Sequence, residues 1–248
     1  MTTSDYLTQL QQDKADLVDN LTTQGITGLT GDETFTELVP EVLNISGSDY
    51  NVLVDTSLPY VRNTGIVCII KNIDLIDTSN MQDFSYMFNN CRQLLSIPTI
   101  DTSRGTDMSA MFYNCANLTS IPLINTSNAT STYRMFSGCI KLVEVPLINT
   151  SNVTGMQQMF ASCSDLVSVP QLNTSNVTNM TNMFNGCSSL NDTSLDNILL
   201  MCINATSYTD TKTLKQLGIT STTYYPVSRI EALPHYQDFI NAGWTIGY

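Results

Sequence analysis

The chain has 248 residues, of which 42% are hydrophobic and only 13% are charged. Its 22 acidic and 10 basic residues give a formal net charge of -12, which disfavours binding to nucleic acid or to an anionic membrane, because both need clustered Lys and Arg. No apolar run approaches the roughly 20 residues of a membrane span, and the first residues lack the basic and apolar regions of a secretory signal.

Residues 1–46 are predicted to form a helical anchoring or assembly module. Leu7, Leu10, Leu17 and Leu21 fall at helical spacing. This stripe predicts either a small packed helix or a self-association helix, and the second alternative implies a homo-trimer. A second helix is expected after residue 32, shortened by the proline at position 40.

Residues 47–76 are predicted to form the N-terminal cap of a solenoid. A short apolar strand is expected over residues 65–70, and isoleucines at 70, 73 and 76 lead into the repeats that follow. Terminal units of a repeat array are atypical because they must cover an open end of the core.

Residues 77–196 contain five copies of a unit of about 24 residues without a register slip. Each copy opens with Asp or Asn followed by Thr-Ser, and then carries a Met-Phe pair, a cysteine and a leucine at constant distances. A strict period in this range predicts a solenoid in which stacked copies share one continuous core. The apolar segment over residues 166–172 predicts a strand, and its equivalents are expected to form a parallel sheet with copies roughly 4.8 Å apart. The opening turns are expected to stack as Asn and Thr ladders.

The string TSNVTNMTNMFNGCSSL, residues 174–190, resembles the BspA-like leucine-rich repeats. More closely, it resembles the surface-protein repeat found in mycoplasma, Firmicutes and gut-phage sequences. The resemblance implies an α+β leucine-rich-repeat solenoid with parallel strands, used for adhesion or protein recognition. The leader over residues 32–45 is similar to the N-terminal helical modules of gut-phage and prophage structural proteins, which implies an anchoring role.

Residues 197–248 are predicted to form a helical C-terminal cap. A first helix is expected to begin near Asp192 or Thr193, just before this boundary, and to continue to Cys202. Further helices are predicted over residues 211–217 and 236–241, followed by an extended tail. Trp244 is expected to pack inside the cap.

The cysteine column is predicted to be structural, because free cysteine behaves as a small buried hydrophobe and no C-x-x-C spacing indicates a metal site. Such a set of unpaired thiols favours synthesis in a reducing cytoplasm. His235 is the single histidine and lies outside the repeats, so the sequence predicts no catalytic site, no cofactor and no metal. An alternative is a calcium ion at the repeat edge between Asp77 and Asp101.

A solenoid recognises partners with side chains that vary between copies on a shared face. On the predicted strands the varying positions include Leu95, Leu123, Val143 and Leu147. Tyrosine and arginine are typical interface anchors. The candidate binding residues are Tyr86, Tyr113, Tyr133, Arg104, Arg134, Glu144 and Gln171.

The function expected from these features is that of a non-enzymatic phage virion protein, made in the host cytoplasm. The N-terminal module would bind other virion proteins, and the repeats would bind a host cell-surface protein or glycan. The alternative is a BspA-like adhesin on a bacterial cell surface, which needs an export signal.

Overall fold

The computed structural model describes residues 78–247 except 93, 98 and 221–223. These residues belong to one of the two compact units of the chain. The predicted module at 1–46, with Leu7, Leu10, Leu17 and Leu21 and the trimer inferred from them, lies outside the described residues. The predicted cap at 47–76 lies outside them as well.

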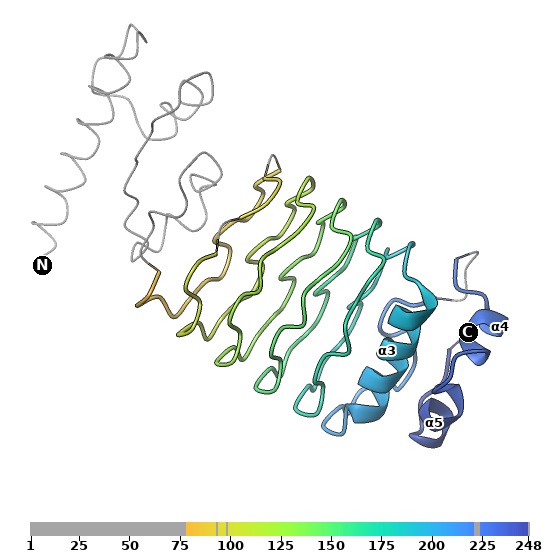
Figure 1. Ribbon diagram of the computed structural model, residues 1–248. Coiled ribbons are helices and arrows are strands. Elements are labelled where there is room, and N and C mark those ends of the chain that lie inside the picture. Colours follow the sequence, from red (N-terminus) through yellow and green to blue (C-terminus); the bar gives the residue numbers. More distant parts are fainter. Residues whose placement is uncertain (1–77, 93, 98, 221–223, 248) are drawn as a thin grey trace, which may run out of the picture. The chain divides into compact units, whose positions relative to one another are not determined.

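The repeats stack as successive turns of the chain, as the yellow to teal part of Figure 1 shows. The phenylalanine of each copy lies above that of the next, with ring centroids 5.1 to 5.7 Å apart and planes within 14° of parallel. The cysteine column and the Met-Phe columns are buried throughout. The stacked columns predicted from the period are therefore confirmed.

The contacts between copies are single hydrogen bonds repeated along turns, so the described residues contain no continuous strand. At the Met-Phe pair, the Phe112 N–H donates to the Met135 carbonyl of the next copy at 2.8 Å. Four of the isolated parallel bridges join consecutive copies from Asp83 to Asn179.

The predicted strand over residues 166–172 is wrong, because this segment holds only the bridge from Glu144 to Ser168. The carbonyl of Val143 accepts from the N–H groups of both Val167 and Ser168, at 2.9 and 3.1 Å. Two residues along, Pro170 has no N–H to donate, so a regular ladder cannot continue.

Two residues of every copy adopt left-handed backbone conformations, one just before the Met-Phe pair and one just before the cysteine. In the third copy these are Arg134, with φ of 54°, and Gly138, with φ of 80°. All eight non-glycine residues with positive φ in the described part of the chain belong to these two columns. Because most residues avoid this conformation, the stacked core must stabilise it in each copy.

Polar side chains of the opening turns also bind between copies. The buried threonine of each of the first four turns donates to the carbonyl of the next opening residue, for example from Thr126 to Asn149 at 2.7 Å, and Thr174 of the fifth turn donates to the Met201 carbonyl of α3. The second asparagine donates back to the preceding copy, for example from Asn152 to the Ser127 carbonyl at 2.7 Å. The predicted Asn and Thr ladders are thus confirmed.

Three helices follow the repeats in the described part of the chain: α3 (Asp192–Asn204), α4 (Val227–Glu231) and α5 (Tyr236–Asn241). The predictions of α3 and α5 are confirmed, whereas α4 was not predicted. Asn191 caps α3 by accepting from the Ser194 N–H at 2.8 Å. Trp244 is buried as predicted.

The helix predicted over residues 211–217 is wrong, because this segment forms turns that extend the hydrogen bonding of the last repeat. The Phe184 N–H donates to the Leu217 carbonyl at 2.8 Å, and the Asn182 N–H donates to the Gln216 carbonyl at 2.7 Å. In a helix, these carbonyls would be directed along the helix axis rather than toward the repeat.

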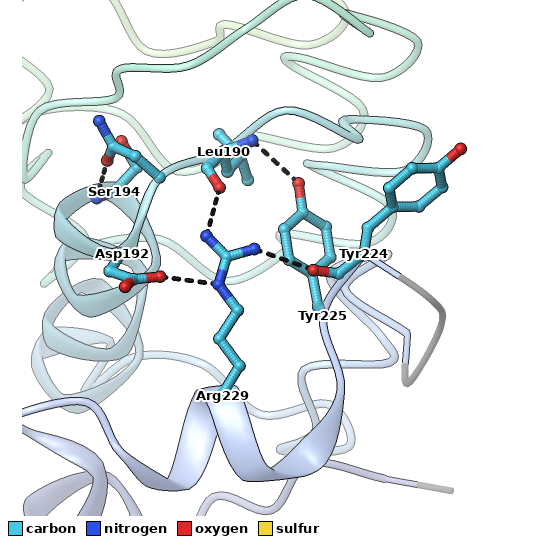
Figure 2. Close-up of polar contacts among 7 residues, drawn as sticks. Leu190, Asp192, Ser194, Tyr224, Tyr225 and Arg229 are labelled. Atoms are coloured by element: carbon cyan, nitrogen blue, oxygen red, sulfur yellow. Dashed lines mark hydrogen bonds and ion pairs between the residues drawn. The ribbon is translucent and has the colours of Figure 1, made fainter.

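Side chains from α4 and from the segment just before it bind the end of the fifth repeat, as Figure 2 shows. Arg229 donates to the Asp192 carboxylate at 2.7 Å and to the Leu190 carbonyl at 3.0 Å. The Tyr225 hydroxyl accepts from the Leu190 N–H at 3.0 Å. It also donates to the Cys187 carbonyl at 2.6 Å. In the first four copies the equivalent leucine N–H donates directly to the cysteine carbonyl of its own copy, so the Tyr225 hydroxyl bridges the two groups in the fifth.

The column before the cysteine offers a matched test of the left-handed backbone. Ser162 occupies this column with φ of 62°, whereas the equivalent residue of the next copy is Gly186. We expect Ser162→Gly to raise the free energy of unfolding by up to about 1 kcal/mol, because glycine adopts this conformation without strain. Urea unfolding followed by Trp244 fluorescence measures the change.

The reverse substitution is the control. Gly186→Ser is expected to lower the free energy of unfolding by about 1 to 2 kcal/mol, since its Cβ would lie 3.3 Å from the Cα of Ser162. If both substitutions changed the free energy of unfolding equally and in the same direction, this account of the turn would be contradicted.

Candidate recognition surface

Three of the predicted binding residues converge near the Met-Phe pairs of the second and third copies. We call this side of the repeats the turn side. The guanidinium carbon of Arg134 lies 5.0 Å from the ring centroid of Tyr133 and 5.8 Å from that of Tyr113. All three side chains are half-buried. We call Tyr113, Tyr133 and Arg134 the Tyr-Arg cluster.

The turn backbone positions this cluster. Tyr133 and Arg134 are adjacent in the third copy, and Arg134, which has the left-handed conformation, directly precedes the Met-Phe pair. Tyr113 follows the phenylalanine of the preceding copy, and its N–H bonds Ala110 within the same turn at 3.0 Å. Residues 20 positions apart in sequence are therefore brought together by the stacking of two turns.

A contact from the fourth copy fixes the arginine. Its Nε donates to the Gln158 side-chain oxygen at 2.6 Å, and Gln158 occupies the same left-handed column one copy later. The two Nη groups of Arg134 have no hydrogen-bond partner among the described residues. The contact of Gln158 with Arg134 was not predicted, although Gln158 lies one repeat period after Arg134 and stacked copies bring such residues together.

The other predicted binding residues lie apart from this cluster in the repeat. Arg104 replaces the second asparagine of the opening turn and donates to the Asn80 side chain at 2.9 Å. Tyr86 shares the column of Arg134 in the first copy and is 40% exposed. Glu144 and Gln171 are exposed on the opposite arm of the repeat, where the strands were predicted.

That arm also carries exposed apolar side chains. Leu123 and Leu147 hold the same position in consecutive copies and are 66% and 64% exposed. Leu95 and Val143 hold another shared position and are exposed as well. The varying face predicted for this segment is therefore solvent-accessible even though the segment is not a strand.

The described thiols are unsuited to nucleophilic chemistry. Cys115, Cys139, Cys163, Cys187 and Cys202 are free and buried. Burial raises the pKa of the thiols of Cys115 and Cys187 to about 12 and raises the pKa of the Cys139 and Cys163 thiols well above the ordinary value. Four of the thiols donate to the phenylalanine carbonyl of the preceding copy at 3.0 to 3.1 Å.

Cys91 corrects the prediction of a wholly unpaired column, because it is disulfide-bonded. It belongs to the first copy, so no earlier Met-Phe pair offers a carbonyl to its thiol.

No group of three or more His, Cys, Asp or Glu side chains within the described residues could hold a metal ion. Asp77 of the alternative calcium site lies outside those residues, and the Asp101 carboxylate accepts from the Ser103 N–H at 2.9 Å. His235 lies 2.7 Å from the Asp196 carboxylate in the C-terminal cap. Among the described helices, none is long and apolar enough to cross a membrane.

Residues 62–164 and 141–209 match the family described as "Mycoplasma protein of unknown function, DUF285". The matched residues cover more than half of the chain, so the protein belongs to this family. The mycoplasma part of the resemblance noted in the sequence is thereby confirmed. No curated protein and no solved structure matches the chain.

Burial of the thiols predicts slow alkylation of the native protein. At pH 8, the free thiols are protonated in the fold because their pKa is raised by burial, and the thiolate is the form that reacts. We expect iodoacetamide to label Cys115, Cys139, Cys163 and Cys187 only after denaturation, as read by peptide mass mapping. Labelling of these four in the native protein at the rate of the urea-unfolded chain would contradict their placement.

Proposed function

We propose that this protein is a non-enzymatic recognition protein whose repeats bind a macromolecule on a cell surface. The Tyr-Arg cluster carries the proposal, because it combines the residue types that anchor interfaces with an arginine fixed in place and still able to donate. A fixed side chain loses little conformational entropy on binding.

The Asn and Thr ladders of the opening turns differ from the candidate binding residues, and this difference supports the proposed recognition function. The Asn and Thr side chains of the opening turns bind neighbouring copies, as Thr126 and Asn152 do. Their hydrogen-bonding capacity is thus largely used within the solenoid. In contrast, the exposed position of Leu147 holds Gln171 in the next copy, and the half-buried Tyr-Arg cluster differs from the equivalent residues of the other copies. Variation on a regular scaffold is how solenoids recognise partners.

We further propose that the repeats are of the BspA-like leucine-rich type and that the protein is a fibre, tail or decoration component of a phage virion. In this proposal the N-terminal module binds virion proteins, and the repeats bind a host cell-surface protein or glycan. The second candidate is a bacterial cell-surface adhesin. It is favoured by the disulfide at Cys91, since disulfides persist in oxidising surroundings.

The first experiment measures binding of the fluorescently labelled full chain to a panel of Gram-positive gut bacteria and epithelial cells. We expect binding to a narrow set of cells, reduced about tenfold or more by the double substitution Tyr113→Ala with Tyr133→Ala, because interface anchors contribute most of the binding energy. Tyr224→Ala is the matched control, since it removes an exposed tyrosine of the C-terminal cap outside the repeats. Absence of binding to every cell type would contradict the proposed recognition function.

Peptide sequencing of purified phage particles and of bacterial envelope fractions separates the two candidates. A virion component is expected in particles at a constant ratio to the other structural proteins. Detection in envelope fractions and not in particles would exclude the virion assignment and support the adhesin.

A further inference from the structure

We propose that the Tyr-Arg cluster binds the carboxylate of an acidic sugar on the cell surface. This inference rests on the proposed function and specifies the chemical class of its ligand. It is carried by the geometry around Arg134, in which the neighbours of the guanidinium group leave only one kind of contact open.

The guanidinium group of Arg134 lies over two tyrosine rings and is hydrogen-bonded at its Nε. The rings of Tyr133 and Tyr113 lie 5.0 and 5.8 Å from its guanidinium carbon, and Gln158 accepts from Nε at 2.6 Å. The two Nη groups remain, and they present parallel N–H donors at the edge of a planar group. Such a fork matches the two oxygens of a carboxylate.

The fixed position of the arginine distinguishes it from other arginines of the described chain. Arg229 donates through Nε, Nη1 and Nη2 to Asp192, Tyr224 and Leu190, so its donors are used within the cap. Arg104 is exposed and donates through Nη1 to Asn80. Arg134 alone of these three has both Nη groups without a protein partner while being held by rings and by Gln158.

The tyrosines favour a sugar over a peptide as the carrier of the carboxylate. Both rings are half-buried, and neither hydroxyl has a hydrogen-bond partner among the described residues. A sugar presents apolar C–H groups and several hydroxyls close together, which matches an aromatic ring with a polar tip. The net charge of -12 repels long acidic polymers as they approach the protein. The ligand is therefore expected to carry isolated carboxylates.

The test uses the full chain and measures binding of D-glucuronic acid, D-glucose and glucose 6-phosphate by saturation-transfer NMR. We expect a response to glucuronic acid and at least about tenfold weaker binding of glucose, because glucose has no carboxylate to accept two parallel hydrogen bonds from the guanidinium fork. Binding of glucose at the same affinity, or tighter binding of glucose 6-phosphate, would overturn the carboxylate assignment.

Arg134→Lys is the decisive variant, because it keeps the positive charge and a non-glycine residue at the left-handed position but removes the fork. We expect it to weaken glucuronic acid binding about tenfold, whereas Tyr224→Ala, at an exposed position of the C-terminal cap, is expected to leave it unchanged. Circular dichroism melting checks that both variants remain folded. Arg134→Gln introduces the shorter, uncharged side chain that the same column carries at position 158. It replaces the lysine variant if that one fails to fold, and an unchanged affinity in the folded variant overturns the inference.

Cell binding by the same variants distinguishes failure of the acidic-sugar inference from failure of the proposed recognition function. If cells bind the protein and glucuronic acid does not, the acidic-sugar inference fails and the recognition function stands. If neither cells nor glucuronic acid bind, both fail. Competition of cell binding by glucuronic acid, lost in Arg134→Lys, is the result expected when both hold.

Discussion

The hydrogen bond from the phenylalanine N–H of one copy to the methionine carbonyl of the next is the interaction on which the described structure depends. It recurs from Phe88 to Phe160 at 2.8 to 2.9 Å and gives the turn side a fixed direction, because donors point toward the C-terminus. On the opposite arm the direction reverses, as in the bond from the Val167 N–H back to the Val143 carbonyl. The end of the array therefore needs carbonyl acceptors for the fifth copy on one side and donors to the fourth copy on the other. Leu217 supplies the acceptor for Phe184 of the fifth copy, while Ser194 and Asn197 of α3 donate to the carbonyls of Val167 and Val169 of the fourth copy at 2.9 Å.

This requirement explains which parts of the fold the sequence could predict. The period predicted the buried Phe and Cys columns, and helical spacing after Asp192 or Thr193 predicted α3, because both signals are local. The segment over residues 211–217 has helical spacing too, but its carbonyls are needed by Phe184 and Asn182, so tertiary bonding overrides local preference. The expected parallel strands failed for a different reason. After the bridge at Ser168, Pro170 has no N–H to donate, so a regular ladder cannot continue.

The candidate site was predictable in its residues and not in its geometry. Residue type alone singled out Tyr113, Tyr133 and Arg134, since exposed tyrosine and arginine are common interface anchors. Their convergence depends on the stacking distance of two turns and on the left-handed backbone of Arg134, neither of which a pattern of letters specifies. The same residue types at Tyr86 and Arg104 do not join the cluster.

The left-handed column also separates what the fold requires from what it leaves free. Arg134, Gln158 and Asn182 hold the same backbone conformation with different side chains, so the turn constrains φ and not chemistry. The N–H groups of this column in the first four copies donate to the next copy, for instance from Arg134 to the Gln157 carbonyl at 3.0 Å, and that of Asn182 donates to the Gln216 carbonyl. Side chains there can change without loss of these backbone hydrogen bonds. A scaffold that fixes its backbone through such bonds can carry a cluster like that of Arg134 on one pair of copies and leave the neighbouring pairs without it.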